Sequence, residues 1–514
     1  METIKNKIAR LVKSAQTYNN IRVALMTTRD RSYSINLIRE LAGEMKQALH
    51  YYSPTYSGQY DFERNAFKPN AMTGSPRFIE PGSIVNQIEK LKEQSVVIVE
   101  DFIRNAGENN NTPPNPGEMV ARNLLVRLMA VKSPGITLIL VESPGAEVHL
   151  PCTVASEIIR IPIPMPKYNE LEECMRSEVA AIAYKNVKKI NAEQIKTWAS
   201  KFARELCGLT LTAGRNEARD ALIDNVDLEA ALKLMGQRKK DLLSRELAMT
   251  ILESAREEVP IGLNNLFNYL KIHQHRICVP GKDRAKGILL IGPPGTGKSM
   301  LAKAIGNWLN FPVIEFRISS LMNSYLGETE RRFESAFAVF EAMAPVVIFI
   351  DEFEKVFSSN SSGGERDGGT MMRVMGRLLS WLNDSNSPNF IVATANNIER
   401  MGEIGSTITR KGRFDKSFFV DVPDLEAREK IFEKLLPEGL KKHKNELAKL
   451  TEKFTGADIE ALIREAKAYS QAVKQDLEIN YLIQEIRKNV SRVNLIHGQF
   501  EELRHWAVLH CEPA

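Results

Sequence analysis

The segment Gly292–Ser299, with the sequence Gly-Pro-Pro-Gly-Thr-Gly-Lys-Ser, constrains the fold of this chain more than any other segment. Its spacing is that of a phosphate-binding loop, G-x-x-x-x-G-K-[ST]. The uncharged aliphatic run Gly287–Ile291 precedes it, as expected of a buried parallel strand, and residues 300–305 after it are typical of a helix. Strand, glycine loop and helix in this order predict a site for a nucleoside triphosphate.

The residues of this loop suit the phosphates of ATP. Glycines let backbone N–H groups converge on phosphate oxygens, at a helix N-terminus whose dipole favours an anion. Lys298 can reach the β- and γ-phosphates, and the hydroxyl of Ser299 can bind Mg²⁺. We therefore expect ATP contacts along the whole loop, from Gly292, Pro293, Pro294, Gly295, Thr296, Gly297, Lys298 and Ser299.

Two carboxylates follow a second apolar run, Val346–Ile350, which is also predicted to be a strand. Asp351 at its end is a candidate to hold Mg²⁺, directly or through water. Glu352 is a candidate to polarise the water that attacks the γ-phosphate. The alternative is a solvated acidic turn, but the phosphate loop about 50 residues upstream favours the catalytic interpretation.

Three further polar residues are candidates for the same site. Asn396 follows the predicted strand Phe390–Thr394 and can donate to the γ-phosphate or orient the water, although asparagine at a strand end is also ordinary turn chemistry. Arg410 and Arg413 can offset negative charge in the transition state, as an arginine finger does. Surface ion pairing is the alternative for both arginines.

Length and composition set wider limits. A chain of 514 residues is too long for one ordinary core, and 43% hydrophobic with 26% charged residues is typical of a globular protein in water. The net charge of +5 does not call for nucleic acid, and no apolar run approaches the roughly 20 residues of a membrane span. The N-terminus lacks the apolar region of a signal peptide, so a cytoplasmic location is expected.

Strands alternate with helices in the first part of the chain, which predicts a parallel sheet covered on both faces. The expected elements are a helix over residues 1–20, a helix over Ser34–Leu49, a loop over Tyr51–Gly82, and the strands Ile21–Met26, Ser95–Asp101, Ile136–Val141 and Ile158–Ile161. The segment Thr27–Ser32 has no glycine and no Gly-Lys pair, so it cannot cradle phosphate in the usual way. For Glu100 and Asp101, a capping or loop role is favoured over metal binding.

Four parts are predicted from these patterns. They are a degenerate α/β domain without a phosphate loop (1–165), a helical lid and linker (166–258) with a helix over Leu242–Glu257, an ATPase α/β part (259–423), and a helical lid with C-terminal helices (424–514). The third part adds the strands Val313–Phe316 and Phe418–Val422 to those named above, and the fourth is helical from Leu425 to Ser470 and on to about Leu509.

The motifs together resemble the AAA family of ATPases over about residues 259–470. They are Gly292–Ser299, Ile350–Glu352, Ala393–Asn396, Arg410–Asp415 and Lys453–Ile459. Within that family, Arg373–Gly376, Trp381-Leu382, Val392–Asn397 and Arg410–Asp415 look like the Ycf-type AAA proteins of cyanobacteria and plastids. Those proteins also place a degenerate ATPase-like domain first, and the resemblance implies the plastid stroma as the location if this chain is plastid-encoded.

The resemblance implies an α/β fold class: a P-loop AAA ATPase module, with a parallel sheet and a helical lid, behind a degenerate AAA-like domain. It implies the cofactors ATP and Mg²⁺, phosphate and metal contacts from Lys298, Ser299 and Asp351, a hydrolytic base in Glu352 and a γ-phosphate sensor in Asn396. The remaining implied sites are the adenine neighbours Gly456 and Ala457, the trans-acting Arg410 with Arg413 as a second candidate, and a pore loop at Tyr325, Leu326 and Gly327. Tyr325 could instead pack at a subunit contact.

Three functions are therefore weighed. The first is an ATP-hydrolysing homo-oligomeric ring, usually of six subunits in this family, that remodels a protein client. The second is a regulatory switch that hydrolyses ATP slowly and binds a partner through its N-terminal domain. The third, a nucleic-acid motor, fits poorly because no basic stretch with interleaved aromatic residues is visible.

Overall fold

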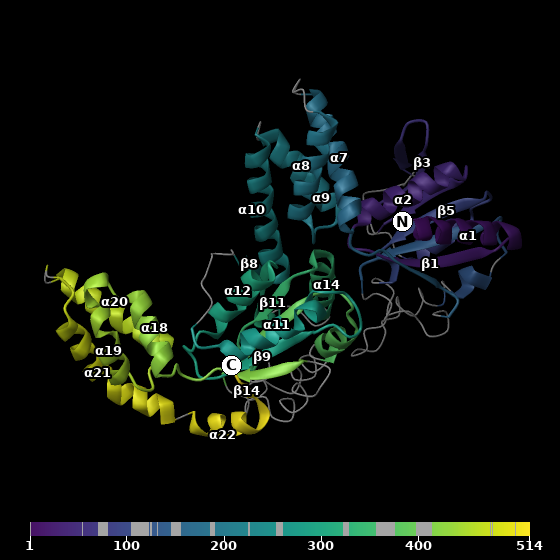
Figure 1. Cartoon of the computed structure of the whole chain (residues 1–514). Helices are drawn as coiled ribbons and strands as arrows, with labels where there is room; N and C mark the ends of the chain where they lie inside the picture. The colour runs from purple at the N-terminus through teal and green to yellow at the C-terminus, as the bar shows by residue number, and fades with distance from the viewer. Residues whose placement is uncertain are drawn as a thin grey trace. The chain divides into compact units, whose positions relative to one another are not determined.

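The computed structural model divides the chain into two compact units, residues 1–238 and 239–514, and each is described by itself (Figure 1). The boundary lies within helix α10 (Leu228–Leu247). The four-part division at residues 165, 258 and 423 stays a prediction. The structure describes residues 2–53, 55–69, 81–103, 123, 126–130, 132–144, 156–185, 191–224, 227–252, 261–321, 328–355, 376–396, 414–472, 474, 476–498 and 500–514.

The first unit is built on a seven-stranded sheet in the order β4-β3-β2-β5-β6-β1-β7. Five neighbouring strands, from β2 to β7 in this order, are parallel, and β3 and β4 extend the sheet as antiparallel strands. The strands are β1 (Ile21–Thr27), β2 (Ala48–Tyr52), β3 (Ser57–Asp61), β4 (Ala66–Pro69), β5 (Ser95–Glu100), β6 (Ile136–Glu142) and β7 (Ile159–Pro162). The predicted parallel sheet is confirmed.

Helices cover both faces of this sheet because its central strands are apolar on both sides. Helices α1 (Glu2–Tyr18) and α2 (Arg31–Glu44) pack on one face, where Leu11 and Ile38 meet Ile98 of β5. Helix α3 (Pro81–Glu89) packs on the other face, where Val85 meets Val97. Neighbouring positions of β5 thus point into different cores, as the two-residue period of a strand requires.

Two expectations for the first unit were wrong. The helix expected to reach Leu49 ends at Glu44, just before Lys46 turns the chain with a φ of 54°. The segment expected as a loop holds the end of β2 and the whole of β3 and β4, although it is rich in Pro, Gly and Ser. Tyr60 and Phe67 pair across β3 and β4 with ring centroids 4.8 Å apart, and such aromatic pairs stabilise a hairpin against poor local propensity.

The rest of the first unit is helical, as expected for residues 168–235. Its helices are α7 (Tyr168–Lys185), α8 (Ala192–Leu206), α9 (Leu211–Asp224) and the start of α10. The helix expected over Leu242–Glu257 was wrong for residues 248–252, because α10 ends at Leu247 and Ala248 has a φ of 52°, and residues 253–257 lie outside the described part of the chain. The next residues form β8 (Met249–Leu252), which pairs antiparallel with β10 in the sheet of the second unit.

The second unit has a seven-stranded sheet in the order β14-β13-β9-β12-β11-β10-β8. Its remaining strands are β9 (Gly287–Ile291), β10 (Val313–Phe316), β11 (Val347–Ile350), β12 (Phe390–Ala395), β13 (Lys416–Phe419) and β14 (Glu512–Pro513). The bounds of β9, β10, β11 and β12 each agree with the predicted strand to within one residue. The last predicted strand, Phe418–Val422, instead begins at Lys416 and ends at Phe419.

Helices on both faces of the second sheet hold its strands in place. Helices α11 (Asn264–Cys278) and α12 (Lys298–Leu309) share one core with Val313 of β10. Helix α14 (Glu328–Met343), which follows the short α13 (Ile318–Leu321), presents Phe333 and Phe340 to Phe316. Val313 and Phe316 point to opposite faces of β10, so α12 and α14 cover opposite faces.

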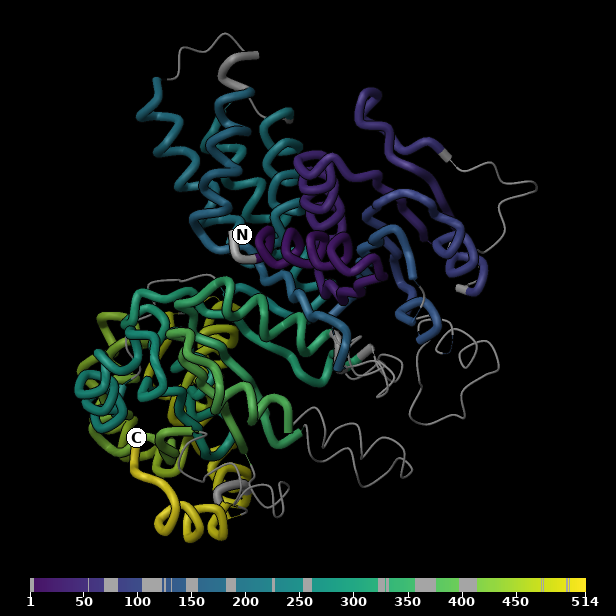
Figure 2. The backbone as a smooth tube through the Cα atoms, turned by 90° about the vertical axis from the view of Figure 1, so that its right-hand side faces the viewer, coloured from purple at the N-terminus to yellow at the C-terminus, as the bar shows by residue number. Residues whose placement is uncertain are grey.

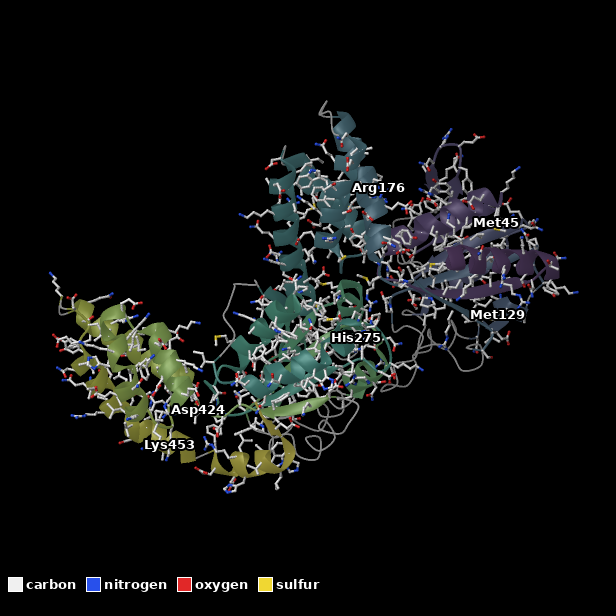
Figure 3. All side chains as sticks on the ribbon, viewed as in Figure 1. Met45, Met129, Arg176, His275, Asp424 and Lys453 are labelled. Atoms are coloured by element: carbon white, nitrogen blue, oxygen red, sulfur yellow. The ribbon has the colours of Figure 1, made fainter. Side chains whose placement is uncertain are left out.

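A helical bundle with its own core follows the sheet. It consists of α18 (Leu425–Leu435), the 3-10 helix η4 (Glu438–His443), α19 (Lys444–Leu450), α20 (Gly456–Ala472) and α21 (Ile479–Gly498). Asp424, labelled in Figure 3, caps α18 by accepting from the N–H of Ala427 at 2.8 Å. Helix α22 (Glu501–His510) leads back to the sheet, where β14 pairs with β13 beside the C-terminus (Figure 2). This last strand was not expected from the sequence.

Gly306 of α12 provides a test of the packing under the phosphate loop. A Cβ atom there would lie 2.1 Å from Cγ2 of Val313, so we expect Gly306→Ala to destabilise the second unit by roughly 1–3 kcal/mol through overpacking. This outweighs the gain of about 1 kcal/mol that alanine brings to an unobstructed helix. Gly439→Ala in η4, where a Cβ would meet nothing within 4 Å, is the control. Equal thermal unfolding midpoints for the two variants would contradict the packing described here.

Candidate functional site

The loop after β9 is shaped by positions where only glycine fits. A Cβ on Gly292 would lie 2.1 Å from the carbonyl oxygen of Val420, so the loop passes the residue after β13 too closely for any side chain. The N–H of Gly292 donates to the carbonyl of Ala395 at 3.1 Å, which fixes the start of the loop to β12. Gly295 and Gly297 have φ values of 83° and 88°, a region that other residues rarely adopt. These constraints explain the glycines of the predicted phosphate loop.

Lys298 begins α12 and turns its side chain back under this loop. The residue is only 6% exposed, and its Nζ donates to the carbonyl oxygens of Gly292 at 2.8 Å and Pro293 at 2.7 Å. Burial lowers the pKa of the Lys298 ammonium to about 8, while Glu354, Asp351 and Glu352 act in the opposite direction. The ammonium is therefore held inside the curve of the loop, where it can meet the phosphates of a nucleotide.

Asp351 lies directly after β11 and joins two hydroxyl groups. Ser299 Oγ donates to Asp351 Oδ2 at 3.3 Å, and Thr394 Oγ1 of β12 donates to the other carboxylate oxygen. A carboxylate beside a serine hydroxyl is a hard-oxygen donor set of the kind that Mg²⁺ takes together with nucleotide phosphates and water. The residues present therefore fit Mg²⁺, and Ser299 and Asp351 are those that would hold it.

Glu352 is held in a special backbone conformation next to Asp351. Its φ is 50°, and its N–H donates to Thr394 Oγ1 at 3.0 Å and to Asp351 Oδ1 at 3.1 Å. A non-glycine residue with positive φ is uncommon, and such strain gathers at functional sites. The Glu352 carboxylate is half-exposed and forms an ion pair of 2.5 Å with Lys355. It is thus accessible to water at the edge of the sheet where the phosphate loop lies.

Glu354 is a residue of this site that the sequence analysis missed. It is 3% exposed, and its Oε1 accepts from the backbone N–H of Asn396 at 3.0 Å, which fixes the residue expected to sense the γ-phosphate. Burial raises the pKa of Glu354, and within the described residues its Oε2 has no hydrogen-bond partner. A third carboxylate two positions after Glu352 was the signal available in the sequence.

The bundle that follows the sheet contributes a contact to the phosphate loop. The N–H of Ala457, in the first turn of α20, donates to the carbonyl of Gly295 at 3.2 Å. A Cβ on Gly295 would lie 2.9 Å from Thr455 Oγ1, so this glycine also makes room for the bundle. Gly456 and Ala457 therefore lie beside the loop. Their contact with adenine remains a prediction.

Other predicted residues lie outside the described part of the chain. These are Tyr325, Leu326, Gly327, Arg410 and Arg413. Asp415, at the end of the arginine motif, is described, and its Oδ2 accepts from the N–H groups of Lys286 and Gly287, the latter at 3.0 Å. It ties the start of β13 to the start of β9, a structural role that the sequence analysis did not assign.

No helix within the described ranges is long and apolar enough to cross a membrane.

Comparison with known proteins identifies two domains. Residues 288–422 match the ATPase family associated with various cellular activities (AAA), and residues 445–480 match the AAA+ lid domain. The chain is 28% identical over 399 residues to the uncharacterised AAA domain-containing protein ycf46 of Guillardia theta, covering 76% of each chain. It is 34% identical over 255 residues to ycf46 of Trieres chinensis, covering 48% of this chain and 50% of that one.

A protein outside the ycf46 group also matches part of the chain. The cell division cycle protein 48 homolog of Archaeoglobus fulgidus is 36% identical over 195 residues, which cover 37% of this chain and 26% of the relative. The chain thus spans half or less of the length of the Trieres and Archaeoglobus relatives. The phosphate loop and the carboxylates after β11 lie within the AAA match, and residues 445–480 of the helical bundle match the lid, so the second unit contains an AAA domain and an AAA+ lid domain.

Proposed function

We propose that this chain hydrolyses ATP to ADP and phosphate with Mg²⁺, as a subunit of a ring that remodels a protein client. The observation that carries the proposal is the hydrogen-bonded group of Ser299, Asp351 and Thr394. It joins the start of α12, the end of β11 and the end of β12 at one point beside the buried Lys298 ammonium. Such a group supports a bound metal and a phosphate chain together.

Each residue of the site has a proposed part in hydrolysis. Lys298 binds the β- and γ-phosphates, and Ser299 and Asp351 hold Mg²⁺, which offsets the charge that develops on the phosphate oxygens. Glu352 accepts a proton from the attacking water, and Asn396 orients that water or donates to the γ-phosphate. The hydrogen bonds from the Glu352 N–H to Thr394 and Asp351 support this role, because they fix the backbone of the base.

The ring and the client belong to the proposal as well. Arg410, with Arg413 as a second candidate, is proposed to reach the ATP of a neighbouring subunit, and six subunits are the expected number. Tyr325, Leu326 and Gly327 are proposed to grip an extended polypeptide in the central pore, since an aromatic ring on a glycine-hinged loop can wedge against a chain of any sequence.

A regulatory switch with slow hydrolysis is the second candidate, and one contact favours it. The Glu352 carboxylate is paired with Lys355 at 2.5 Å, so the proposed base must leave this cation before it accepts a proton from water. Turnover that stays slow in the presence of any client would favour the switch.

Replacement of the proposed base separates ATP binding from hydrolysis. In Glu352→Gln we expect ATP binding to persist while the turnover number falls roughly a hundredfold or more, because the amide cannot accept the proton. Lys298→Ala should instead lose binding. Calorimetric titration with ATP and a steady-state phosphate-release assay measure the two effects, and light scattering with ATP reports assembly. Wild-type turnover in Glu352→Gln would refute its role as base.

The low pKa of Lys298 predicts a pH dependence of ATP binding. The ammonium, whose pKa burial lowers to about 8, is charged below that pH and neutral above it, so affinity for ATP should be highest below pH 8. We expect the affinity to fall about tenfold between pH 7 and pH 9, as linkage requires for a single proton. Lys298→Arg keeps its charge over this range and should remove the slope, even if it binds less tightly. An identical slope in both proteins would assign the titration to another group.

The pore loop is testable once a client protein has been captured with the Glu352→Gln variant. We expect Tyr325→Ala to abolish the stimulation of ATP turnover by that client. Basal turnover should stay unchanged, because the tyrosine side chain is proposed to touch the polypeptide and not the nucleotide. Tyr18→Ala, which removes a tyrosine that is 68% exposed on α1, is the control. Unchanged client processing in Tyr325→Ala would refute threading through the pore.

A further inference from the structure

Thr394, near the end of β12, carries a buried hydroxyl group beside the proposed metal ligand Asp351. The residue is 1% exposed, and a hydroxyl in such a place is costly unless it is hydrogen bonded. Its Oγ1 donates to Asp351 Oδ1 and accepts from the backbone N–H of Glu352 at 3.0 Å. The amide can only donate and the carboxylate can only accept, so the single hydroxyl proton lies between Thr394 and Asp351.

The two oxygens of the Asp351 carboxylate are held by hydroxyl groups from different elements. Ser299 Oγ of α12 donates to Oδ2 at 3.3 Å, and Thr394 of β12 donates to Oδ1. The carboxylate therefore cannot turn about its Cβ–Cγ bond without breaking one of these bonds. Ser299 is itself expected to bind the metal, which leaves Thr394 as the hydroxyl whose task is to orient the carboxylate.

The first unit contains a similar turn without this hydroxyl. Its strands β7-β1-β6-β5-β2 lie in the same order as β13-β9-β12-β11-β10 of the second unit, and both sets are parallel. Asp101 follows β5 with a φ of 53°, and Glu352 lies just beyond β11 with a φ of 50°. These two residues thus occupy equivalent turns at the ends of corresponding strands.

The neighbouring strand of the first unit has a valine in place of the threonine. The residue before Asp101 pairs with Val141 of β6. The residue before Glu352 continues the register of β11 with β12 and lies opposite Thr394. A positive φ therefore forms beside an aliphatic side chain in the first unit, so the turn itself does not need the hydroxyl. The carboxylate of Asp351 is then the group that the hydroxyl serves.

The carboxylates at the turn of the first unit have partners of other kinds. Glu100 accepts from the hydroxyl of Tyr51, and Asp101 accepts two hydrogen bonds of 2.7 Å from the guanidinium of Arg31. The hydrogen bonds that the structure describes for the Asp351 side chain come from two hydroxyl groups and a backbone N–H, which are neutral donors. A carboxylate held by neutral donors keeps its charge available to a cation such as Mg²⁺.

We propose that Thr394 is a positioning residue of the metal site, whose hydroxyl fixes the direction of the Asp351 carboxylate toward Mg²⁺. This rests on the proposed function, in which Ser299 and Asp351 hold the metal. Hydrogen-bond partners of metal ligands orient those ligands, and their loss typically lowers metal affinity or activity roughly 10–100-fold. Loss of the Thr394 hydroxyl should therefore weaken metal binding and spare the contact of Lys298 with the phosphates.

Calorimetric titration with ATP, once with Mg²⁺ and once with EDTA, tests the proposal in the full-length Glu352→Gln protein, which is expected to bind ATP without turnover. The ratio of the two affinities measures the contribution of the metal. Thr394→Val keeps the shape of the side chain and removes the hydroxyl. We expect it to lower the ratio about tenfold or more and to leave the affinity in EDTA unchanged. Thr394→Ser keeps the hydroxyl and should retain most of the ratio.

Thr137→Val is the matched control. Thr137 lies in β6, is also 1% exposed, and within the described residues its Oγ1 has no hydrogen-bond partner. The same loss of a buried hydroxyl should leave the ratio unchanged there. Phosphate release with Glu352 intact gives a second measurement. The Mg²⁺ concentration for half-maximal turnover should rise about tenfold or more in Thr394→Val, and excess Mg²⁺ should restore most of the turnover.

A lower ratio in Thr394→Val, with retention in Thr394→Ser and Thr137→Val, supports the positioning role. An unchanged ratio in Thr394→Val, or an equal loss in Thr394→Ser, would overturn this role and leave the proposed ATPase function in place. Equal losses of affinity with Mg²⁺ and with EDTA would also overturn it, because they indicate a distorted phosphate loop. If the parent protein showed no Mg²⁺-dependent ATP binding, the proposed function and the positioning role would both be refuted.

Discussion

The site of the second unit depends on a buried lysine ammonium whose hydrogen bonds, among the residues that the structure describes, go to backbone carbonyl oxygens. Lys298 meets two carbonyl oxygens of its own loop, and removal of its charge from water lowers its pKa. Glycine at position 292, where a Cβ would lie 2.1 Å from the carbonyl oxygen of Val420, lets the loop keep this path. The site therefore holds a desolvated cation that is hydrogen bonded to neutral carbonyl groups. A polyanion such as a phosphate chain would stabilise this cation more strongly than those carbonyl groups do.

Much of this architecture could be predicted because buried parallel strands leave uninterrupted apolar runs in the sequence. The run before Asp351 and the run before Gly292 were each placed within one residue. Since parallel strands end at one edge of their sheet, Ser299 and Asp351 could be expected to meet although 52 positions separate them. The proximity of these groups follows from pattern and topology alone.

The rest depended on partners that are distant along the chain. The hairpin of β3 and β4 rests on the Tyr60–Phe67 contact, and β8 exists because β10 offers it an edge. Glu354 and Asp415 look like ordinary acidic residues until their backbone donors are known. Asp30 accepts a hydrogen bond from Thr212, 182 positions away, and no local sequence pattern predicts this pair. Tertiary contacts override local preference at each of these places.

The hydrogen bond from Ala457 to Gly295 has a mechanical consequence. The first turn of α20 donates this bond to the carbonyl of Gly295, a residue whose positive φ curves the loop. Rotation of the bundle must therefore break the bond or move the loop. A loop that tightens around a ligand would in turn draw α20 toward the sheet. The hydrogen bond from Ala457 to Gly295 therefore couples the position of the bundle to the curvature of the loop.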